Sequence, residues 1–244
     1  MRIAVIADVH GNLGALDAVL ADIAGKRVDQ IVNLGDVVSG PLQPAETADR
    51  LMRLALPTVR GNHERQLLTL EPGKMGESDR FASDRLSPAQ RSWLSSLPST
   101  MIVAGDVYLC HGTPESDVDY FLESVDETGC HPAATAEVEK RAAGCMATLL
   151  LCGHTHLQRC LMLSGGRMVL NPGSVGLQAY EATWPQPHTI EIGTPHARYA
   201  IAERVEEMWQ LEFAEVAYDW ESAARIAEVN GREEWAKALR TGRA

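Results

Sequence analysis

The sequence predicts an α/β protein built on two β-sheets, and three observations predict it. Apolar runs of strand length recur along the chain, and helical stretches separate the first of them. In the second half, apolar runs come in pairs, as in β-hairpins. No repeat and no low-complexity linker interrupts the 244 residues. We therefore expect residues 1–244 to form a single domain.

The first quarter of the chain predicts the order βαβαβ. Residues 2–7 (RIAVIA) form an apolar run typical of a buried strand, and residues 30–34 (QIVNL) and 56–60 (LPTVR) predict the next two strands. Apolar residues recur at helical spacing between 13 and 23, and residues 44–56 predict a second helix. This alternation favours a parallel sheet, where ligands gather beyond the carboxyl ends of the strands.

The remaining helices are expected in two places. Residues 70–99 are polar and predict short helices, the clearest of which opens with Ser87 as N-cap and Pro88 in the first turn. The tail from about residue 218 predicts two short helices broken near Asn230-Gly231.

The remaining strands are expected mainly as hairpins. STMIVAGDVYLCHG predicts a turn at Gly105-Asp106, and CLMLSGGRMVLNPGSVG predicts one at Gly165-Gly166. ATLLLCGHTH reads as a strand between them, and ARYAIAER pairs with MWQLEFAEV. The second half of the chain is therefore expected to consist mostly of hairpins.

Composition excludes several classes of protein. No segment approaches the roughly 20 apolar residues of a membrane span, and the start of the chain lacks the features of a secretory peptide, so we expect a soluble cytoplasmic protein. The formal charge is −11 and no Lys/Arg cluster is present, which argues against bulk binding of nucleic acid. The five cysteines include no CxxC pair, so we expect reduced thiols rather than disulfides or a zinc knuckle. The oligomeric state stays open.

Residues of metal-ligand type stand at the end of each expected strand in the first two thirds of the chain. They are Asp8, His10, Asp36, Asn62, His63, His111, His154 and His156. Taken alone, the stretch ADVHGN also fits a simple turn, because Asp and Asn bond the local backbone and Gly adopts a positive φ. The joint pattern instead indicates a metal site. Side chains two residues apart in an extended segment face the same way, so both could bind one ion.

The types of donor atom limit which metal ions the site is expected to bind. Neutral imidazoles, carboxylates and an Asn carbonyl suit manganese, iron, zinc or nickel, whereas calcium prefers oxygen ligands alone. No thiolate is required. Cys110 points away from the face of His111, and Cys152 shares a face with His154, but for both we expect the role of a small buried hydrophobe.

The ordered set DVH, GD, GNHE, HG and GHTH resembles that of the calcineurin-like metallophosphoesterases, over residues 8–156. NPGSVG at 171–176 is similar to a segment of their small bacterial and archaeal phosphodiesterase branch. The resemblance implies a four-layer αββα sandwich, in which two mixed β-sheets are flanked by helices. It also implies a dinuclear metal centre that hydrolyses phosphate esters.

The resemblance further implies a role for each residue. Asp8, His10 and His156 would hold one metal, Asn62, His111 and His154 the other, and Asp36 would bridge the two. A hydroxide bridging two divalent ions would attack phosphorus in line, and His63 would protonate the leaving group. No nucleophilic side chain is needed.

One motif departs from part of the superfamily. The protein Ser/Thr phosphatases and diadenosine-tetraphosphatases carry GDxxDRG, whereas this chain reads GDVVSGP, with Ser39 and Gly40 in place of the acid and the arginine. Arg60 or Arg65, which flank GNHE, would bind the phosphate in place of the missing arginine. Both also fit the role of charged surface residues. Glu64 fits a helix cap or a solvated residue. The departure favours small phosphodiesters, with a phosphomonoesterase or a protein or nucleotide phosphatase as the alternative.

A second alternative is a non-catalytic interaction scaffold, since a retromer subunit of similar fold acts in this way. All seven ligand positions and His63 are present here, which favours the enzyme. The substrate is not predicted, but the pocket walls are expected from residues 65–100, 112–133 and 176–190. The acidic segment HGTPESDVDYF could repel long polyanions. The aromatic segment YEATWPQPH could stack on a nucleobase. Each segment also fits a plain surface loop.

Overall fold

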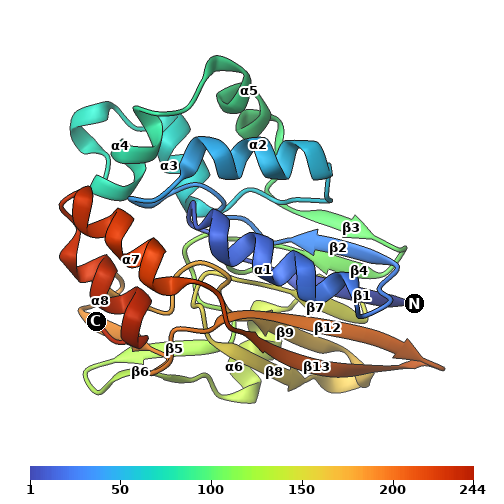
Figure 1. Ribbon diagram of the computed structural model, residues 1–244. Helices are drawn as coiled ribbons and strands as arrows, with labels where there is room; N and C mark the ends of the chain where they lie inside the picture. The colour runs from blue at the N-terminus through green and yellow to red at the C-terminus, as the bar shows by residue number, and fades with distance from the viewer.

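The computed structural model describes residues 1–244 and contains two main β-sheets that face each other, with helices on the outside (Figure 1). The first sheet has the order β13-β12-β1-β2. Its strands are β1 (Arg2–Ile6), β2 (Gln30–Asn33), β12 (Ala197–Val205) and β13 (Met208–Val216). Because β1 runs parallel to β2 and antiparallel to β12, this sheet is mixed.

The second sheet has the order β3-β4-β7-β9-β8 and is also mixed. Its strands are β3 (Met101–Val103), β4 (Val107–Leu109), β7 (Leu149–Leu151), β8 (Gln158–Met162) and β9 (Met168–Pro172). β4, β7 and β9 run parallel, whereas β3 and β8 pair antiparallel as the two expected hairpins.

The alternation of side chains along β1 explains the layers. Ile3 and Val5 point into an apolar core shared with β4, β7 and β9 of the second sheet, while Ala4 and Ile6 point to the opposite face and pack under helices. That outer layer consists of α1 (Leu13–Ala24), α2 (Pro44–Leu54), α3 (Asn62–Thr69), the 3-10 turn η1 (Pro72–Lys74), α4 (Glu77–Ser83) and α5 (Pro88–Ser96). On the far side, α6 (Thr135–Arg141) packs on the second sheet through Val138. The expected four-layer αββα sandwich is confirmed.

The C-terminal tail forms the two expected helices, α7 (Trp220–Val229) and α8 (Glu233–Thr241), which pack as a hairpin against one flank of the sandwich (Figure 1). Their apolar faces meet Leu42, Leu177 and Ala179 in a separate core cluster. None of the helices of the chain is long and apolar enough to cross a membrane.

The prediction of a strand at residues 56–60 is wrong. Only Thr58 bridges to Asn33, in parallel, and the chain then leaves the sheet, where the amide of Arg60 donates to Pro98 O at 2.8 Å. Pro57 has no N–H to donate, so it cannot extend a ladder on both sides. The apolar run LPTVR therefore lies beside β2 without becoming a strand.

Two small hairpins and one helix were not expected from the sequence. The hairpins are β5 (Glu123–Asp126) with β6 (Gly129–Pro132), and β10 (Ala179–Ala182) with β11 (His188–Glu191), and the helix is α6. Each of their strands has only four residues, too few to show a clear alternation of polar and apolar side chains. β6 contacts β11, and β10 contacts α8, so distant parts of the chain support both hairpins. All five cysteines are free, and Cys110 and Cys152 are buried hydrophobes as expected.

Candidate metal centre

The structure brings together all eight residues that the sequence analysis selected. Asp8 and His10 follow β1, Asp36 follows β2, His111 follows β4, and His154 and His156 follow β7, while Asn62 and His63 begin α3. These strands end at the same edge of the two sheets, so the loops after them converge on one place, as parallel strands require.

The donor atoms form two separate groups. Asp8, His10 and His156 make the first, and Asp36, His111 and His154 make the second, with the ligand atoms of each group within 4.8 Å of one another. Asn62 joins the second group, because its Oδ1 lies 3.0 Å from His111 Nε2. Each group offers the mixture of imidazole nitrogen and carboxylate oxygen that divalent transition metals prefer.

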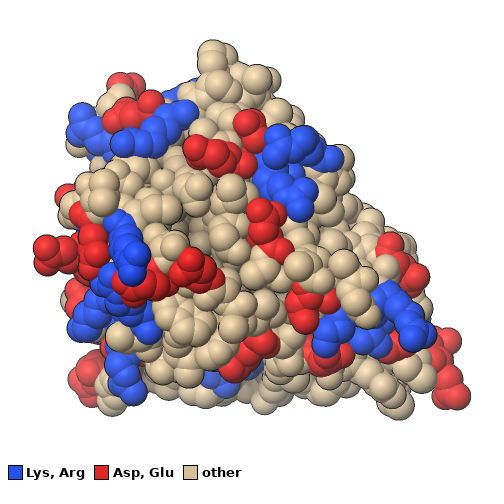
Figure 2. Space-filling view, viewed as in Figure 1, with Lys and Arg blue, Asp and Glu red and all other residues tan.

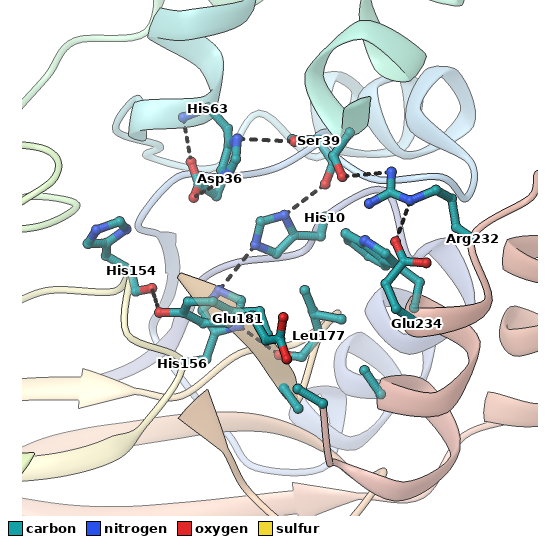
Figure 3. Close-up of a pocket in the computed structure, with 16 residues that line it drawn as sticks. His10, Asp36, Ser39, His63, His154, His156, Leu177, Glu181, Arg232 and Glu234 are labelled. Carbon is teal, nitrogen blue, oxygen red and sulfur yellow. Dashed lines mark hydrogen bonds and ion pairs between the residues drawn. The ribbon is translucent and has the colours of Figure 1, made fainter. Parts of the chain in front are cut away.

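The hydrogen bonds of the imidazoles fit a bound cation. Nδ1 of His10 lies 2.7 Å from Ser39 O, and Nδ1 of His156 lies 2.7 Å from Leu177 O. A carbonyl only accepts, so both Nδ1 atoms carry a proton, and the neutral form of each ring presents a lone pair at Nε2. These two Nε2 atoms nevertheless lie 3.1 Å apart (Figure 3). Two facing lone pairs repel each other, and a cation bound between them removes that repulsion.

The backbone of the site is strained. Asp8, His10, Asp36, His154 and His156 all have positive φ angles, between 51° and 70°. Residues other than glycine rarely adopt this conformation, which costs about 1–3 kcal/mol at each position. The extended backbone expected for each pair is therefore wrong, although Asp8 and His10 do enter the same group as expected. The side chains converge because the loops turn, and His154 and His156 enter different groups.

The simple turn that the ADVHGN stretch also predicts is present in its second half. Gly11 has a φ of 68°, and Asn12 caps α1 by accepting from the amide of Ala15 at 3.1 Å. Asn12 Nδ2 also donates to Gly176 O, which fastens this loop to the NPGSVG segment. The stretch therefore ends β1, places two metal donors and begins a helix within six residues.

Glu64 has a larger part in the site than the sequence suggested. Its buried carboxylate accepts from the amides of Asp36, Val37 and Gly61 at 2.8 to 3.0 Å. Burial and the nearby Asp36 raise the pKa of Glu64 to about 7, while the bonds from Gly61 and Val37 lower it. Gly61 must be glycine, because a Cβ there would lie 2.1 Å from Asp36 Oδ1. Together they fix the loop that carries Asp36.

The NPGSVG segment supports the other two loops. Asn171 Nδ2 donates to Gly153 O at 2.6 Å and to Thr155 Oγ1 at 3.0 Å, within the loop that carries His154 and His156. Ser174 Oγ donates to Asp8 O at 2.8 Å. Asn171, Ser174 and Thr155 are polar and buried, so the segment acts by holding the loops.

The electrostatics of the two groups favour the metal-binding state of His10, His154 and Asp36, but not of His111. Burial lowers the pKa of His10 to about 4 and that of His154 to about 3, which keeps both imidazoles neutral. Burial raises the pKa of Asp36, but His111 and His63 outweigh this effect and hold it well below its usual range. Burial likewise lowers the pKa of His111, but Asp36 outweighs it and brings the value to about 10, so a cation competes with a proton there.

His63 stands beside the two groups and is held by a carboxylate that no motif revealed. Its Nδ1 lies 2.7 Å from Asp79 Oδ1 in α4, and Ser39 Oγ donates to the same oxygen at 2.8 Å. Burial lowers the pKa of His63, but Asp36 and the bond to Asp79 outweigh it and raise the pKa to about 9. The side chain is 30% exposed, and its Nε2 remains available to a ligand, 4.0 Å from Asp36 Oδ2.

Neither Arg60 nor Arg65 lines the cavity at this site. Arg65 forms a bidentate pair with Asp117, at 2.6 and 2.8 Å. The guanidinium that does line the cavity belongs to Arg232, which precedes α8 (Figure 3). A lone arginine in the C-terminal tail carries no sequence signal that would have indicated this position.

The cavity has a volume of about 450 Å³ and opens over both donor groups. Its walls include Ser78 from the expected 65–100 region. From the expected 176–190 region they include Leu177, Ala179, Tyr180 and Glu181. Residues 112–133 line a separate depression. The opposite wall comes from α8 through Arg232, Glu234, Trp235 and Ala238, which the sequence analysis did not predict.

A sandwich of two mixed sheets with histidine and aspartate donors at the shared strand ends defines a class of metal-dependent hydrolases. The profile of the calcineurin-like phosphoesterase superfamily domain matches residues 1–190. The chain belongs to this family and is a metal-dependent phosphoric ester hydrolase, with two groups of His and Asp side chains that could hold divalent metal ions.

Individual relatives agree with this assignment. An uncharacterized protein of Methanocaldococcus jannaschii is 28% identical over 96% of this chain and 94% of its own. The crystal structure of a metallophosphoesterase from Sphaerobacter thermophilus superposes with a TM-score of 0.76 at 27% identity, covering 99% of both chains. A structure of a candidate diadenosine tetraphosphatase has a TM-score of 0.53 at 19% identity, covering 88% and 94%, and shows the shared fold alone.

Proposed function

We propose that the protein hydrolyses small phosphodiesters with two divalent ions, one held by Asp8, His10 and His156 and the other by Asn62, His111 and His154, with Asp36 shared. The observation that supports it most is that both donor groups and His63 open into one cavity. When bound, two such cations polarise the phosphoryl group and lower the pKa of a water to near neutrality. Manganese, iron, zinc and nickel all suit the donors.

His63 supplies the proton in this proposal. Its pKa of about 9 keeps the ring protonated near neutral pH. Asp79 accepts from Nδ1, which leaves the proton on Nε2 facing the cavity, where the leaving oxygen of the ester would lie. Ser39 donates to the same carboxylate and fixes its orientation. His63 is therefore the general acid, and Asp79 is a positioning residue.

Arg232 favours a second candidate, a phosphomonoesterase. Its guanidinium lines the cavity, and a monoester dianion gains more from such a cation than a diester does. However, Arg232 Nε is already paired with Glu234 at 2.5 Å and lies 3.5 Å from Glu77, so much of its charge is compensated within the protein. For this reason we place the diester first.

The remaining alternatives have less support. An interaction scaffold does not need buried, strained metal donors, which are costly to maintain. Binding of nucleic acid through bulk charge has no support on the face in Figure 2, where basic and acidic side chains lie interspersed. The five free cysteines fit the reducing cytoplasm that we propose as the location.

The test compares metal-free and metal-reconstituted protein on matched aryl substrates. We expect no turnover after chelation, recovery with manganese, zinc or nickel, and a higher kcat/KM for bis(p-nitrophenyl) phosphate than for p-nitrophenyl phosphate. A higher kcat/KM for the monoester would establish the second candidate instead. Absence of turnover of every ester after reconstitution would refute hydrolysis at this site.

A further inference from the structure

We propose that α8 and β10 form a subsite for the second ester arm of the substrate, and that this subsite accepts a compact uncharged arm and rejects an arm with a second phosphate. The inference rests on the proposed function and names the class of diester that the site would take.

The cavity is larger than the two donor groups and a phosphoryl group require. Its volume of about 450 Å³ lies within the range of roughly 300–1,000 Å³ that is typical of small-ligand sites. His10, His63, His154 and His156 line one side, and α8 with the start of β10 lines the other (Figure 3). The space between the two sides is therefore available to the organic part of a substrate.

The wall formed by α8 and the start of β10 contains an apolar stretch beside the charged pair of Arg232 and Glu234. Leu177, Ala179 and Ala238 line it, and the small side chains of the two alanines leave the space open. Trp235 is 7% exposed and packs on Gly40, where a Cβ would lie 2.8 Å from the indole ring. Burial of an uncharged arm against such a wall makes the free energy of binding more favourable, by roughly 25 cal/mol for each Å² of apolar surface buried.

The charges at the rim disfavour a further anion. Arg232 is the sole Lys or Arg that lines the cavity, and it is paired with Glu234. Glu181, on β10, also lines the cavity and forms neither a hydrogen bond nor an ion pair through its side chain. One cation thus faces two carboxylates on this side, so a second phosphate would meet net negative charge.

The first experiment uses wild-type enzyme and four p-nitrophenyl diesters. Their second arms are methyl, phenyl, thymidine joined through its 5′ oxygen, and the same thymidine carrying a 3′-phosphate. We expect kcat/KM to rise from methyl to phenyl or thymidine, and to fall at least threefold when the 3′-phosphate is added. Turnover of the methyl ester with equal kcat/KM for all four would overturn the subsite while leaving phosphodiester hydrolysis intact.

A second experiment changes the wall. Ala238→Leu narrows the subsite and should lower kcat/KM for the thymidine ester about tenfold, mainly through KM, with a smaller effect on the methyl ester. Glu233→Leu places the same side chain on the exposed surface of α8, outside the cavity, and serves as the matched control. Leu177→Ala enlarges the subsite from the other side and should preserve binding of the larger arms. Equal losses for the methyl and thymidine esters in Ala238→Leu would contradict the assignment.

A third experiment changes the charge. Glu181→Lys should raise kcat/KM for the 3′-phosphorylated ester about tenfold relative to the unphosphorylated one, because the rim then carries net positive charge. Glu127→Lys makes the same change in the exposed turn between β5 and β6, outside the cavity, and should leave the ratio unchanged. An unchanged ratio in Glu181→Lys would show that the rim does not select against the second phosphate.

Discussion

At the scale of single residues, the carboxylate beside His63 shows how the chain completes a site whose local motif is incomplete. The position in GDVVSGP where related phosphatases carry an acid is Ser39. Asp79, 40 residues further on, supplies a carboxylate to His63, and Ser39 Oγ bonds to it. The function of one motif is thus divided between a loop and a short helix.

This arrangement predicts different effects for two substitutions. His63→Ala should leave metal content near normal and lower kcat on the order of 100-fold for a diester with a poor leaving group, with a smaller loss for an aryl ester. Asp79→Asn should lower kcat less and in the same pattern, because the ring remains but loses its carboxylate partner. Metal analysis and a leaving-group series measure both effects. Losses independent of the leaving group would indicate that His63 binds phosphate.

At the scale of elements, the first turn of α3 connects the two donor loops through one buried side chain. Glu64 bonds three amides, of which two belong to the loop after β2 and one to Gly61 before the helix. Both carboxylate oxygens of Glu64 accept hydrogen bonds from these backbone amides. If a glutamine replaced Glu64, its NH2 group would therefore face a backbone N–H, and two donors would meet.

Glu64→Gln should therefore destabilise the protein by about 1–3 kcal/mol, the cost of a buried donor left without an acceptor. It should also weaken metal binding, since Asp36 is in the loop that Glu64 holds. Chemical denaturation and metal titration measure the two effects. Glu127→Gln, in an exposed turn, is the control. A fall in stability with unchanged metal affinity would limit Glu64 to a structural role.

Much of the element order could be predicted from the sequence, and the reasons for success and failure are local. β1, α1 and the hairpin at Gly105-Asp106 carry strong apolar periodicity or turn chemistry. The run at 56–60 has the apolar composition of a strand, but Pro57 and the turn toward α3 prevent it from pairing. The candidate metal donors could be selected because residues of metal-ligand type follow successive apolar runs. Asp79 and Arg232 depend on how distant helices pack, which no local pattern contains.

At the scale of the whole molecule, the donor groups join loops from both sheets. Asp8 and Asp36 follow strands of the first sheet, and His111, His154 and His156 follow strands of the second. Metal bound there should link the two halves of the sandwich. The same residues are strained and hold closely spaced like groups in the absence of a cation.

Metal should consequently raise the midpoint of thermal unfolding. At a free concentration 100 times Kd, a ligand specific for the folded state adds about 2.7 kcal/mol of stability for each site. Calorimetry of chelator-treated protein with and without manganese or zinc measures the shift. Asp36→Ala should show a much smaller shift, because in our proposal that residue serves both ions. A full shift in this variant would contradict the shared carboxylate.

The pairing of β1 with β12 also has a consequence for the order in which the protein can assemble. Arg2 is opposite Glu203, so the strand that pairs with one edge of β1 lies about 200 residues later in the chain. During synthesis from the N-terminus, β1 and β2 leave the ribosome long before β12 exists. The growing chain thus exposes an apolar strand edge for most of its translation, and α8, which closes the cavity, arrives after β12. Every candidate metal donor and β10 are already synthesised by then, so the part of the cavity wall that α8 supplies is the last part of the site to form.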